Sequence, residues 1–552
     1  TLVKGRRGKE KFHAFRSAGE KMGHWLTVGM PSISVTATGE GVVSALNRPK
    51  GLQVYNQSPF QLVYDTDFAP SGSTLDPVRI CGARNGPFGG QVVLASDKPI
   101  RGLKASMSEL RREGGGTIPA SAVRVLYPQP TLDDPDGQAR LPGAWNTPVC
   151  FFDSFAEAAP KTVPVRKKKA RYALREYVFG AVQPLWIKAQ APADCEPGTY
   201  KGKLTVETEG VDPVEVPVEL RVSEWVVPPP HEWRTFCDFM QSPESVWIAY
   251  KTKMWSEDHW RHIEASLRHL GSVGNKTVYL RLVAKTENGN SQTILPWIRQ
   301  PDGSLKPDFT LVDRYLQLAK KHLVKPTVVC LYVWERQLGG GYFGRTPQNW
   351  DPIEVSVFDP KTGESSLAEV APYNEIEKMK TFWKPAAEGV RERMKALGWS
   401  DALMLGIGDD WIPAKEIVQL WKDLLPEAPW VSMGHDVPGA YHGIQKAGYV
   451  TTVWGPKWAR SASDRLHGWR RESLVCHYDR DSWRRSAMEQ FFSSGYMAGD
   501  RNICGAQRGF GRMNGDFFSL PGAGGHRKNR GLTPARYPGA HKEQLLLTMN
   551  PY

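Results

Sequence analysis

Val226-Val227-Pro228-Pro229-Pro230 marks the point where the hydrophobic pattern of the sequence changes. Consecutive prolines cannot continue a β-ladder, so this run predicts a stiff linker between two domains. A chain of 552 residues has room for two or three domains with full-sized cores. The sequence therefore divides at about residue 230, and the hydrophobic residues recur with a different period in each of the two parts.

Upstream of the linker the pattern is that of β-strands. Short alternating runs, separated by Gly, Pro and Asp, occur at residues 91–94, 123–127, 185–189, 203–207 and 214–222. Several short strands at this spacing predict a β-sandwich over residues 1–230, although roughly the first 75 residues show no clear pattern.

Downstream of the linker, strand-like runs alternate with amphipathic helical runs. The eight predicted strands are 233–239, 277–283, 327–333, 403–407, 430–433, 449–454, 473–478 and 502–506. The clearest helices are 257–270, 311–323, 374–397 and 482–492. This alternation predicts a TIM-type (β/α)8 barrel over residues 231–515. We therefore expect a multidomain β plus α/β protein, with residues 516–552 as a C-terminal extension.

A barrel of this kind carries its active site at the C-terminal ends of the strands, so polar residues there are candidates. These residues are Asp238, Gln241, Glu335, Asp409, Asp410, His435, Asp436, His477, Asp479, Gln507 and Arg508. Trp334, Trp411 and Trp454 belong to the same rim. Sugar rings have apolar faces edged with hydroxyls, so tryptophans beside carboxylates favour a glycan ligand.

Composition excludes several other classes. No stretch of eighteen apolar residues could cross a membrane. The seven cysteines contain no C-x-x-C pair, which excludes a zinc ribbon, and Cys237, Cys330 and Cys476 fall in predicted buried strands. No His, Asp and Glu cluster has metal-ligand spacing, so we predict neither a metal nor a cofactor. Gly339-Gly340-Gly341 lacks the context of a phosphate cradle and is predicted to be a flexible rim loop.

The net charge of +13 is concentrated near the C-terminus, where residues 457–542 hold 16 Lys or Arg against 7 Asp or Glu. Such a tract attracts anions, but no nucleic-acid-binding motif accompanies it, which favours an acidic or sulfated glycan as partner. We expect at least one of Arg480, Arg508 and Arg512 to point into the barrel mouth and bind an acidic substituent. The alternative is that these arginines lie on the outer helix surface and serve solubility.

Three stretches of the sequence form recognisable motifs. They are Pro184-Leu185-Trp186-Ile187 with Pro197-Gly198-Thr199-Tyr200-Lys201-Gly202, then Trp255-Ser256-Glu257-Asp258-His259-Trp260, and finally Gly398-Trp399 with Gly408-Asp409-Asp410-Trp411. These motifs resemble those of glycoside hydrolase family 123. The match runs from about residue 80 to about residue 410. The family's Trp-rich stretch near the last strand is not recognisable in residues 499–518, and we expect its small C-terminal sandwich to be missing or truncated.

The resemblance implies a substrate-assisted retaining mechanism on a β-linked 2-acetamido sugar, of the N-acetylgalactosamine type. Asp409 would hold the acetamido nitrogen so that the acetamido oxygen attacks the anomeric carbon, and Asp410 would protonate the leaving oxygen. The family has Glu where this sequence has Asp410. The loss of one methylene withdraws the carboxyl by roughly 1.5 Å, and a misplacement of about 1 Å can cost about a hundredfold in rate.

Other readings of these residues remain open on the sequence alone. Asp410 is a good N-cap for a helix that starts in Trp411-Ile412-Pro413. Glu335 either binds sugar hydroxyls or pairs with Arg336. His477 and Asp479 either form a sugar-binding pair or are satisfied strand-end residues. A further alternative makes Asp479 the nucleophile of an ordinary two-carboxylate mechanism, with Asp410 as acid.

Two functions follow. The first is an exo-acting glycoside hydrolase on a β-linked N-acetylhexosamine, and the second is a non-catalytic glycan-binding or structural surface protein derived from one. The sequence, which starts at Thr1 and shows no signal peptide, is expected to be extracellular, periplasmic or at the cell surface. It gives no indication of the oligomeric state.

Overall fold

The computed structural model describes residues 3–4, 28–29, 48–130 except 60, 62, 70 and 71, then 152–165, 178–286, 290–342, 349–407 and 411–432. It also describes the short stretches 442, 444–446, 449–451, 478–480 and 509–516. The chain forms two compact units, Thr1–Asn47 and Arg48–Tyr552. In the first unit, Val3–Lys4 (β1) pairs antiparallel with Val28–Gly29 (β2).

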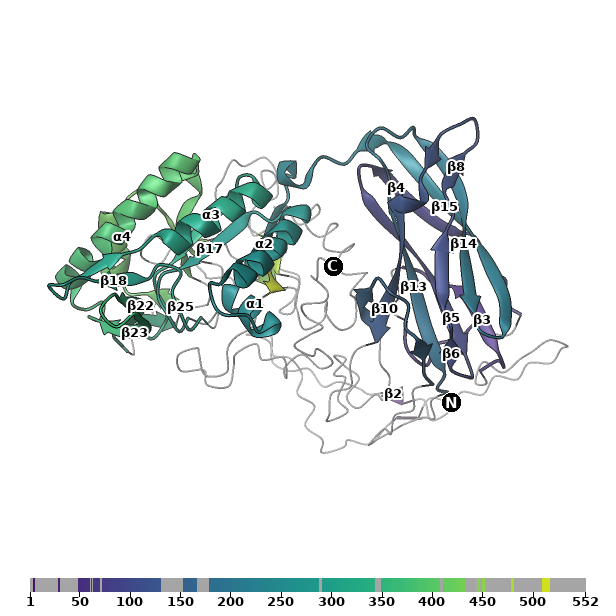
Figure 1. Ribbon diagram of the computed structural model, residues 1–552, viewed down its shortest axis with the longest axis horizontal. Helices are drawn as coiled ribbons and strands as arrows, with labels where there is room; N and C mark the ends of the chain where they lie inside the picture. Colours follow the sequence, from purple (N-terminus) through teal and green to yellow (C-terminus); the bar gives the residue numbers. More distant parts are fainter. Residues whose placement is uncertain are drawn as a thin grey trace. The chain divides into compact units, whose positions relative to one another are not determined.

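The N-terminal part of the second unit is a sandwich of two sheets (Figure 1). One sheet has the order β11-β10-β13-β5-β3, made of Phe152–Ala156, Val123–Pro130, Ala181–Gln190, Pro87–Ser96 and Leu52–Asn56. The other has the order β4-β15-β14-β8-β9, made of Val78–Arg84, Val211–Val226, Gly198–Thr208, Leu110–Arg112 and Thr117–Ile118. Lys104–Met107 (β7) also pairs with β14, and Ile100–Arg101 (β6) pairs with Thr162–Val163 (β12).

Alternation of buried and exposed side chains along the strands explains why the two sheets pack face to face. In β15 the residues Val216, Val218, Leu220 and Val222 point inward while their neighbours are exposed or half-buried. They share one core with residues of the opposite sheet, such as Leu185 and the other inward-facing positions of β13 and β5. The predicted sandwich is therefore present, and it begins at β3, within the part of the sequence that shows no clear pattern.

The last strand of the sandwich ends where the linker was predicted to begin. Strand β15 stops at Val226, and the next backbone N–H, of Val227, donates to the Arg84 carbonyl at 2.9 Å. A short 3-10 turn, Pro230–Glu232 (η2), follows, and the Trp233 indole N–H donates to the Pro228 carbonyl at 2.7 Å.

The C-terminal part is built on parallel strands. One sheet has the order β17-β20-β24-β26-β27, made of Thr277–Arg281, Val328–Tyr332, Leu403–Ile407, Trp430–Ser432 and Gln445–Lys446. The other has the order β16-β30-β29-β28, made of Phe236–Gln241, Gly509–Asp516, Tyr478–Arg480 and Tyr449–Thr451. A parallel bridge between Cys237 and Asn275 connects β16 to the chain entering β17. The last described strand, β30, therefore pairs with the first strand of this part.

Two predicted strands fall largely outside the described residues. Of the seventh, expected at 473–478, only Tyr478 is described, and it begins the strand Tyr478–Arg480. The eighth, expected at 502–506, lies outside the described residues. The described strand that pairs with β16 is Gly509–Asp516, which was not predicted from the sequence.

Three helices between the strands begin and end close to the predicted residues, namely Glu257–Ser272 (α2), Thr310–Leu323 (α3) and Ile376–Leu397 (α4). Pro243–Tyr250 (α1) and Lys415–Leu424 (α5) were not among the predicted helices. Helices α2 and α3 lie side by side (Figure 1). Both bury one apolar stripe on the parallel strands, for example Ile263 and Leu267 of α2 and Leu316 of α3. Predicted helix 482–492 lies outside the described residues.

A four-stranded sheet with the order β19-β18-β22-β23 was not predicted from the sequence. Its strands are Leu305–Pro307, Trp297–Arg299, Ile353–Asp359 and Glu364–Val370. They come from the connections after β17 and β20, at the carboxyl ends of those strands. Trp297 of this sheet stacks on Phe382 of α4, with ring centroids 4.1 Å apart, so the insert shares the main core.

Two of the three cysteines expected in buried strands lie there. Cys237 and Cys330 are both buried, and burial raises the pKa of the Cys237 thiol to about 12. A thiol with that pKa stays protonated and packs as a small apolar group. Cys476 lies outside the described residues.

Candidate functional site

Gln241 is the last residue of β16, at the predicted strand end, whereas Asp238 lies within the strand, and both are buried. The Tyr279 hydroxyl of β17 donates to Asp238 Oδ1 at 2.8 Å. Gln241 Oε1 accepts a hydrogen bond of 2.6 Å from the Tyr315 hydroxyl of α3. Each predicted side chain is therefore held in place by a tyrosine from a neighbouring element, which fixes its orientation.

Arg281, at the carboxyl end of β17, adds a buried cation to this region. It is 4% exposed, and one of its terminal nitrogens donates to the Gln241 carbonyl at 3.1 Å. Within the described part of the chain, Arg281 Nε and Gln241 Nε2 are buried and have no hydrogen-bond acceptor. Unpaired buried donors are uncommon in folded proteins and are typical of sites that receive a ligand or a water.

Glu244 is a buried carboxyl that the sequence analysis missed. It lies in the first turn of α1, three residues after Gln241, and is 2% exposed. Burial raises the pKa of Glu244 to about 7, although Arg281 and backbone N–H groups, among them that of Gln292 at 3.3 Å, act in the opposite direction. A carboxyl that holds its proton near neutral pH can donate a hydrogen bond or a proton, which is a property of functional sites.

Titration of Glu244 should make stability fall as pH rises. The folded protein keeps the proton up to about pH 7, whereas the unfolded chain releases it near its ordinary value of about 4.3. The free energy of unfolding of the wild type, relative to that of Glu244→Gln, should therefore drop by about 3 kcal/mol between pH 4.5 and pH 8. Chemical denaturation of both proteins across this range measures the difference.

Glu257→Gln is the matched control, because Glu257 is exposed and paired with Arg314, which lowers the pKa of its carboxyl. Its difference from the wild type should stay flat above pH 4.5. A flat difference for Glu244→Gln as well would show that Glu244 is ionised at neutral pH.

Trp334 and Glu335 follow β20, and both are buried. The Trp334 indole N–H donates to the Gly339 carbonyl at 3.0 Å, and Trp334 belongs to the main core. Glu335 Oε1 accepts from the backbone N–H of Arg336 at 3.0 Å. The structure places Trp334 under the glycine run Gly339-Gly340-Gly341, so its role in sugar binding stays a prediction.

The glycine run is not a loop, as was predicted, but contains a strand. Gly340–Tyr342 (β21) pairs antiparallel with Trp411–Pro413 (β25). Glycine has no hydrophobic period and low strand propensity, so the sequence pattern could not indicate this pair.

Asp409 and Asp410 lie outside the described residues, between β24, which ends at Ile407, and β25, which begins at Trp411. Helix α5 begins at Lys415 with Ala414 as its N-cap residue. The alternative that Asp410 caps a helix starting at Trp411 is therefore wrong, because those residues form a strand.

The remaining predicted residues are described only in part. Tyr478–Arg480 contains Asp479 and Arg480, and Asp479 pairs with Val450 and Phe510 in the sheet. Arg512 lies in β30, where the register against β16 shifts between Asp238 and Phe239. The predicted His435, Asp436, Trp454, His477, Gln507 and Arg508 lie outside the described residues, and of Trp411 only the backbone is described.

The stretch Trp255-Ser256-Glu257-Asp258-His259-Trp260 has a structural role. Ser256 is the N-cap of α2 and accepts from the His259 backbone N–H at 3.3 Å. His259 Nδ1 accepts from the Trp255 N–H at 2.9 Å, which leaves Nε2 to donate to the Pro243 carbonyl at 2.8 Å. Burial lowers the pKa of this imidazole, so it stays neutral and fixes the start of α2 against the start of α1.

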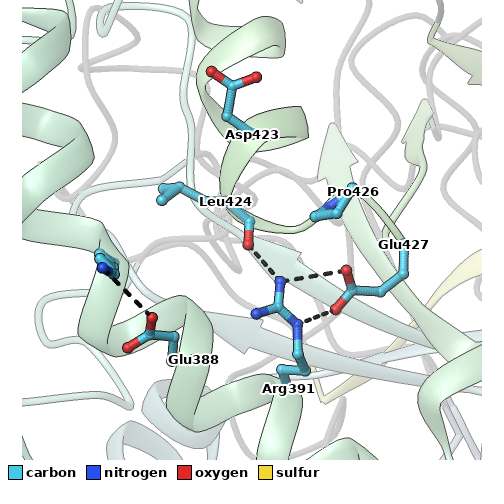
Figure 2. A pocket seen from close by; sticks show the side chains of 7 residues that line it. Glu388, Arg391, Asp423, Leu424, Pro426 and Glu427 are labelled. Carbon is cyan, nitrogen blue, oxygen red and sulfur yellow. Dashed lines mark hydrogen bonds and ion pairs between the residues drawn. The ribbon is translucent and has the colours of Figure 1, made fainter.

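A surface hollow between α4 and the end of α5 is a poor candidate for chemistry (Figure 2). Arg391 donates to Glu427 Oε1 at 2.5 Å and to the Leu424 carbonyl at 2.5 Å (Figure 2). Lys380 and Asp423 form an ion pair of 2.6 Å beside it. Its charges already neutralise one another, which is typical of a solvated helix surface.

Neither a metal-ligand cluster nor a membrane-spanning helix is found in the described part of the chain. No group of three His, Cys, Asp or Glu there could hold a metal ion. None of the helices in those ranges is long and apolar enough to cross a bilayer.

Comparison with known proteins agrees with this architecture. The model of the glycoside hydrolase 123 N-terminal domain matches residues 82–208, and the model of the glycoside hydrolase 123 catalytic domain matches residues 240–446. Together they cover more than half of the chain. No curated protein sequence matches it.

Among solved structures, a family 123 glycoside hydrolase from Clostridium perfringens, studied for glycolipid glycan hydrolysis, is similar with a TM-score of 0.64 at 16% identity. The match covers 84% of this chain and 78% of that one. A GH5 xyloglucanase from Bacteroides ovatus has a TM-score of 0.18 at 8% identity, covering 70% and 72% of the two chains. A PapD-like domain of human CEP192 has a TM-score of 0.15 at 12% identity, covering 35% and 99%. The TM-scores of the xyloglucanase and the PapD-like domain are too low to indicate a shared fold.

The two matched family models assign the chain to a class of glycoside hydrolases. The chain is a glycoside hydrolase family 123-like protein, as its matched domains show. Both matched family models support glycoside hydrolase activity.

Proposed function

We propose that this protein is an exo-acting glycoside hydrolase that removes a β-linked N-acetylhexosamine, of the N-acetylgalactosamine type, by a substrate-assisted retaining mechanism. Asp409 orients the acetamido group, and Asp410 protonates the leaving oxygen. The observation that carries the proposal is the match of the family's catalytic domain to residues 240–446, which include both aspartates.

The parallel strands favour a closed barrel around this site. Strand β30 pairs with β16, β16 is bridged to the start of β17, and the order then follows the chain to β27. Strands β27 and β28 are consecutive in the chain. Each is the last strand of one of the two described parallel sheets, at the edge opposite the bridge between β16 and β17. We propose that β27 and β28 together count as one strand, which completes an eight-stranded barrel whose mouth holds the aspartates, with Asp238, Gln241, Arg281 and Glu335 around them.

The buried cluster at the carboxyl ends of β16 and β17 supports a ligand that offers hydrogen-bond acceptors. Arg281 Nε and Gln241 Nε2 are donors without partners within the described ranges, and a sugar hydroxyl or acetamido oxygen accepts from such groups. The similar enzyme from Clostridium perfringens was studied on glycolipid glycans. A glycan at a cell surface is therefore the proposed substrate, and it would place this protein extracellularly, in the periplasm or at the cell surface.

The test is a panel of chromogenic glycosides. The wild type should hydrolyse β-N-acetylgalactosaminide or β-N-acetylglucosaminide and leave the matching β-galactoside and β-glucoside intact, because these lack the acetamido nucleophile. Equal rates on glycosides with and without the acetamido group would contradict the proposed mechanism.

A second function, glycan binding without hydrolysis, is favoured by the short acid Asp410. It predicts binding of amino-sugar glycans in calorimetry with no turnover of any glycoside in the panel. That combination would replace the first proposal.

The basic C-terminal tract predicts salt-sensitive recognition of acidic glycans. If Arg480, Arg508 or Arg512 contacts a sulfate or carboxylate, the dissociation constant for a sulfated glycan should rise severalfold between 50 and about 300 mM salt, because exposed charge contacts are screened. A neutral glycan of the same backbone is the control and should bind with equal affinity at both salt concentrations. If the binding of both glycans does not depend on salt, the basic tract serves solubility and does not bind the glycan.

A further inference from the structure

Arg281 and Glu244 bring opposite charges together in the core of the C-terminal part. Arg281 is the last residue of β17 and is 4% exposed, and Glu244, in the first turn of α1, is 2% exposed. Burial raises the pKa of the Glu244 carboxyl, and Arg281 has the largest influence among the groups that lower it. The described hydrogen bonds of both side chains nevertheless involve the backbone. Arg281 donates to the Gln241 carbonyl at 3.1 Å, and Glu244 accepts from the Gln292 N–H at 3.3 Å.

Two hydrogen-bond donors beside these charges have no described partner. Arg281 Nε and Gln241 Nε2 are buried and lack an acceptor within the described ranges. The orientation of the Gln241 amide is fixed, because its Oε1 accepts from the Tyr315 hydroxyl at 2.6 Å. The Nε2 group is thus the open end of this side chain. A buried donor without an acceptor destabilises a fold, so two such donors together are typical of a site whose ligand supplies the acceptor.

Glu244 is held in place by the connection that follows β17. Its partner Gln292 also accepts a hydrogen bond of 2.8 Å from the Trp255 indole N–H. Trp255 has φ of +60°, a left-handed conformation that a bulky residue rarely adopts. Residues persist in such conformations where the surrounding contacts fix them, and they are common at ligand sites. The connections before α2 and after β17 therefore both support the position of the Glu244 carboxyl.

The three side chains start where parallel sheets bind ligands. Gln241 ends β16, Glu244 follows in α1, and Arg281 ends β17. Strand β16 is bridged to the chain entering β17, so these carboxyl ends are neighbours. In folds built on parallel strands the ligand binds at this end of the sheet.

A hydroxyl group is the ligand that matches this set of partners. It has two lone pairs that accept and one hydrogen that is donated, and the cluster offers two open donors and one carboxyl. A carboxylate or sulfate has acceptors only, and Glu244 repels it once that carboxyl is ionised. An ammonium group has donors only and is repelled by the guanidinium of Arg281.

We infer that Arg281, Gln241 and Glu244 form a hydroxyl-binding subsite, in which one hydroxyl of the terminal sugar accepts from Arg281 Nε and Gln241 Nε2 and donates to Glu244. This inference rests on the proposed function for the identity of the sugar. The three side chains determine which sugar binds, and they take no part in breaking the glycosidic bond.

The test is the binding of sugars that lack one hydroxyl. The methyl β-thioglycosides of N-acetylgalactosamine and of its monodeoxy derivatives resist hydrolysis, and calorimetry gives the Kd of each. At least one deoxy derivative should bind the wild type about 10- to 100-fold more weakly than the parent, because it leaves the buried donors unpaired. The derivative with fluorine at the same position should bind as weakly, since fluorine cannot donate to Glu244.

Gln241→Glu and Arg281→Lys each remove one open donor. Gln241→Glu keeps the oxygen that accepts from Tyr315, and Arg281→Lys keeps the positive charge, so either variant carries the test if the other does not fold. In each variant the ratio of the two Kd values should fall by about fivefold or more. Gln419→Glu is the matched control, because it makes the same change at an exposed residue of α5 whose amide donates to Asp423. Its ratio should equal that of the wild type.

Several results would overturn the inference. Equal Kd values for the parent and all its monodeoxy derivatives, or no binding of any of them, would show that the cluster holds a water and no sugar. A loss of affinity that persists unchanged in Gln241→Glu and Arg281→Lys would assign the hydroxyl to other residues. A fluoro derivative that binds like the parent would contradict the role of Glu244.

The proposed function is decided separately, by turnover of the chromogenic glycosides. If the wild type shows the expected pattern of binding but hydrolyses none of them, the subsite stands and the proposed hydrolysis fails. If it hydrolyses N-acetylhexosaminides while the monodeoxy derivatives bind like the parent, hydrolysis stands and the subsite fails.

Discussion

Asp410→Asn should lower kcat on a natural glycan by about 10²- to 10⁴-fold, the usual contribution of a general acid. An amide cannot protonate the leaving oxygen, and a sugar alkoxide is a poor leaving group without that proton. A glycoside with a strongly acidic phenol as leaving group needs little protonation, so its hydrolysis should fall far less. The ratio of the two rates, measured for the wild type and the variant, reports on proton donation itself.

The control for this ratio is Asp409→Asn, which should slow both substrates to a similar extent because the acetamido oxygen attacks in both. A uniform loss in Asp410→Asn, with no dependence on the leaving group, would remove Asp410 from the acid role. Glu244, with its pKa of about 7, would then be the described carboxyl to test next.

Trp383→Ala should lower the free energy of unfolding by about 3 to 5 kcal/mol, as large-to-small changes in a packed core do. Trp383 of α4 is fully buried, and its ring lies 5.4 Å from that of Trp421 in α5 and 6.1 Å from that of Trp297 in the inserted sheet, between ring centroids. The substitution therefore removes contacts to two other elements at once. Urea denaturation measures the change.

Trp225→Ala is the matched control, because this tryptophan at the end of β15 is 60% exposed. Its substitution should change stability by no more than about 0.5 kcal/mol. A small effect of Trp383→Ala, similar to that of the control, would mean that the inserted sheet does not pack on α4 as described.

Strong local patterns allowed much of the fold to be predicted. The apolar run Leu403–Ile407 and the amphipathic stretch that became α2 have clear periods and sharp flanking signals, including the Ser256 cap. The sandwich strands likewise alternate cleanly, as in β15. Where local propensity and tertiary packing favour the same conformation, the hydrophobic period alone identifies a strand or a helix.

Features decided by tertiary contacts could not be predicted. Gly340–Tyr342 becomes a strand only because β25 and Trp334 lie against it, and glycine carries no period that could indicate this. In the sequence, Glu244 looks like an ordinary acidic residue in the first turn of a helix. Only the structure shows that its side chain is buried. The inserted sheet pairs strands from two different connections, a relation that no local window contains.

The central claim is that a substrate acetamido group attacks the anomeric carbon, and the anomer released first tests it most directly. Proton NMR during hydrolysis of a β-linked N-acetylgalactosaminide follows that anomer before mutarotation. A substrate-assisted retaining mechanism proceeds by two inversions at the anomeric carbon, so the β-anomer should appear first. Initial release of the α-anomer would contradict the account.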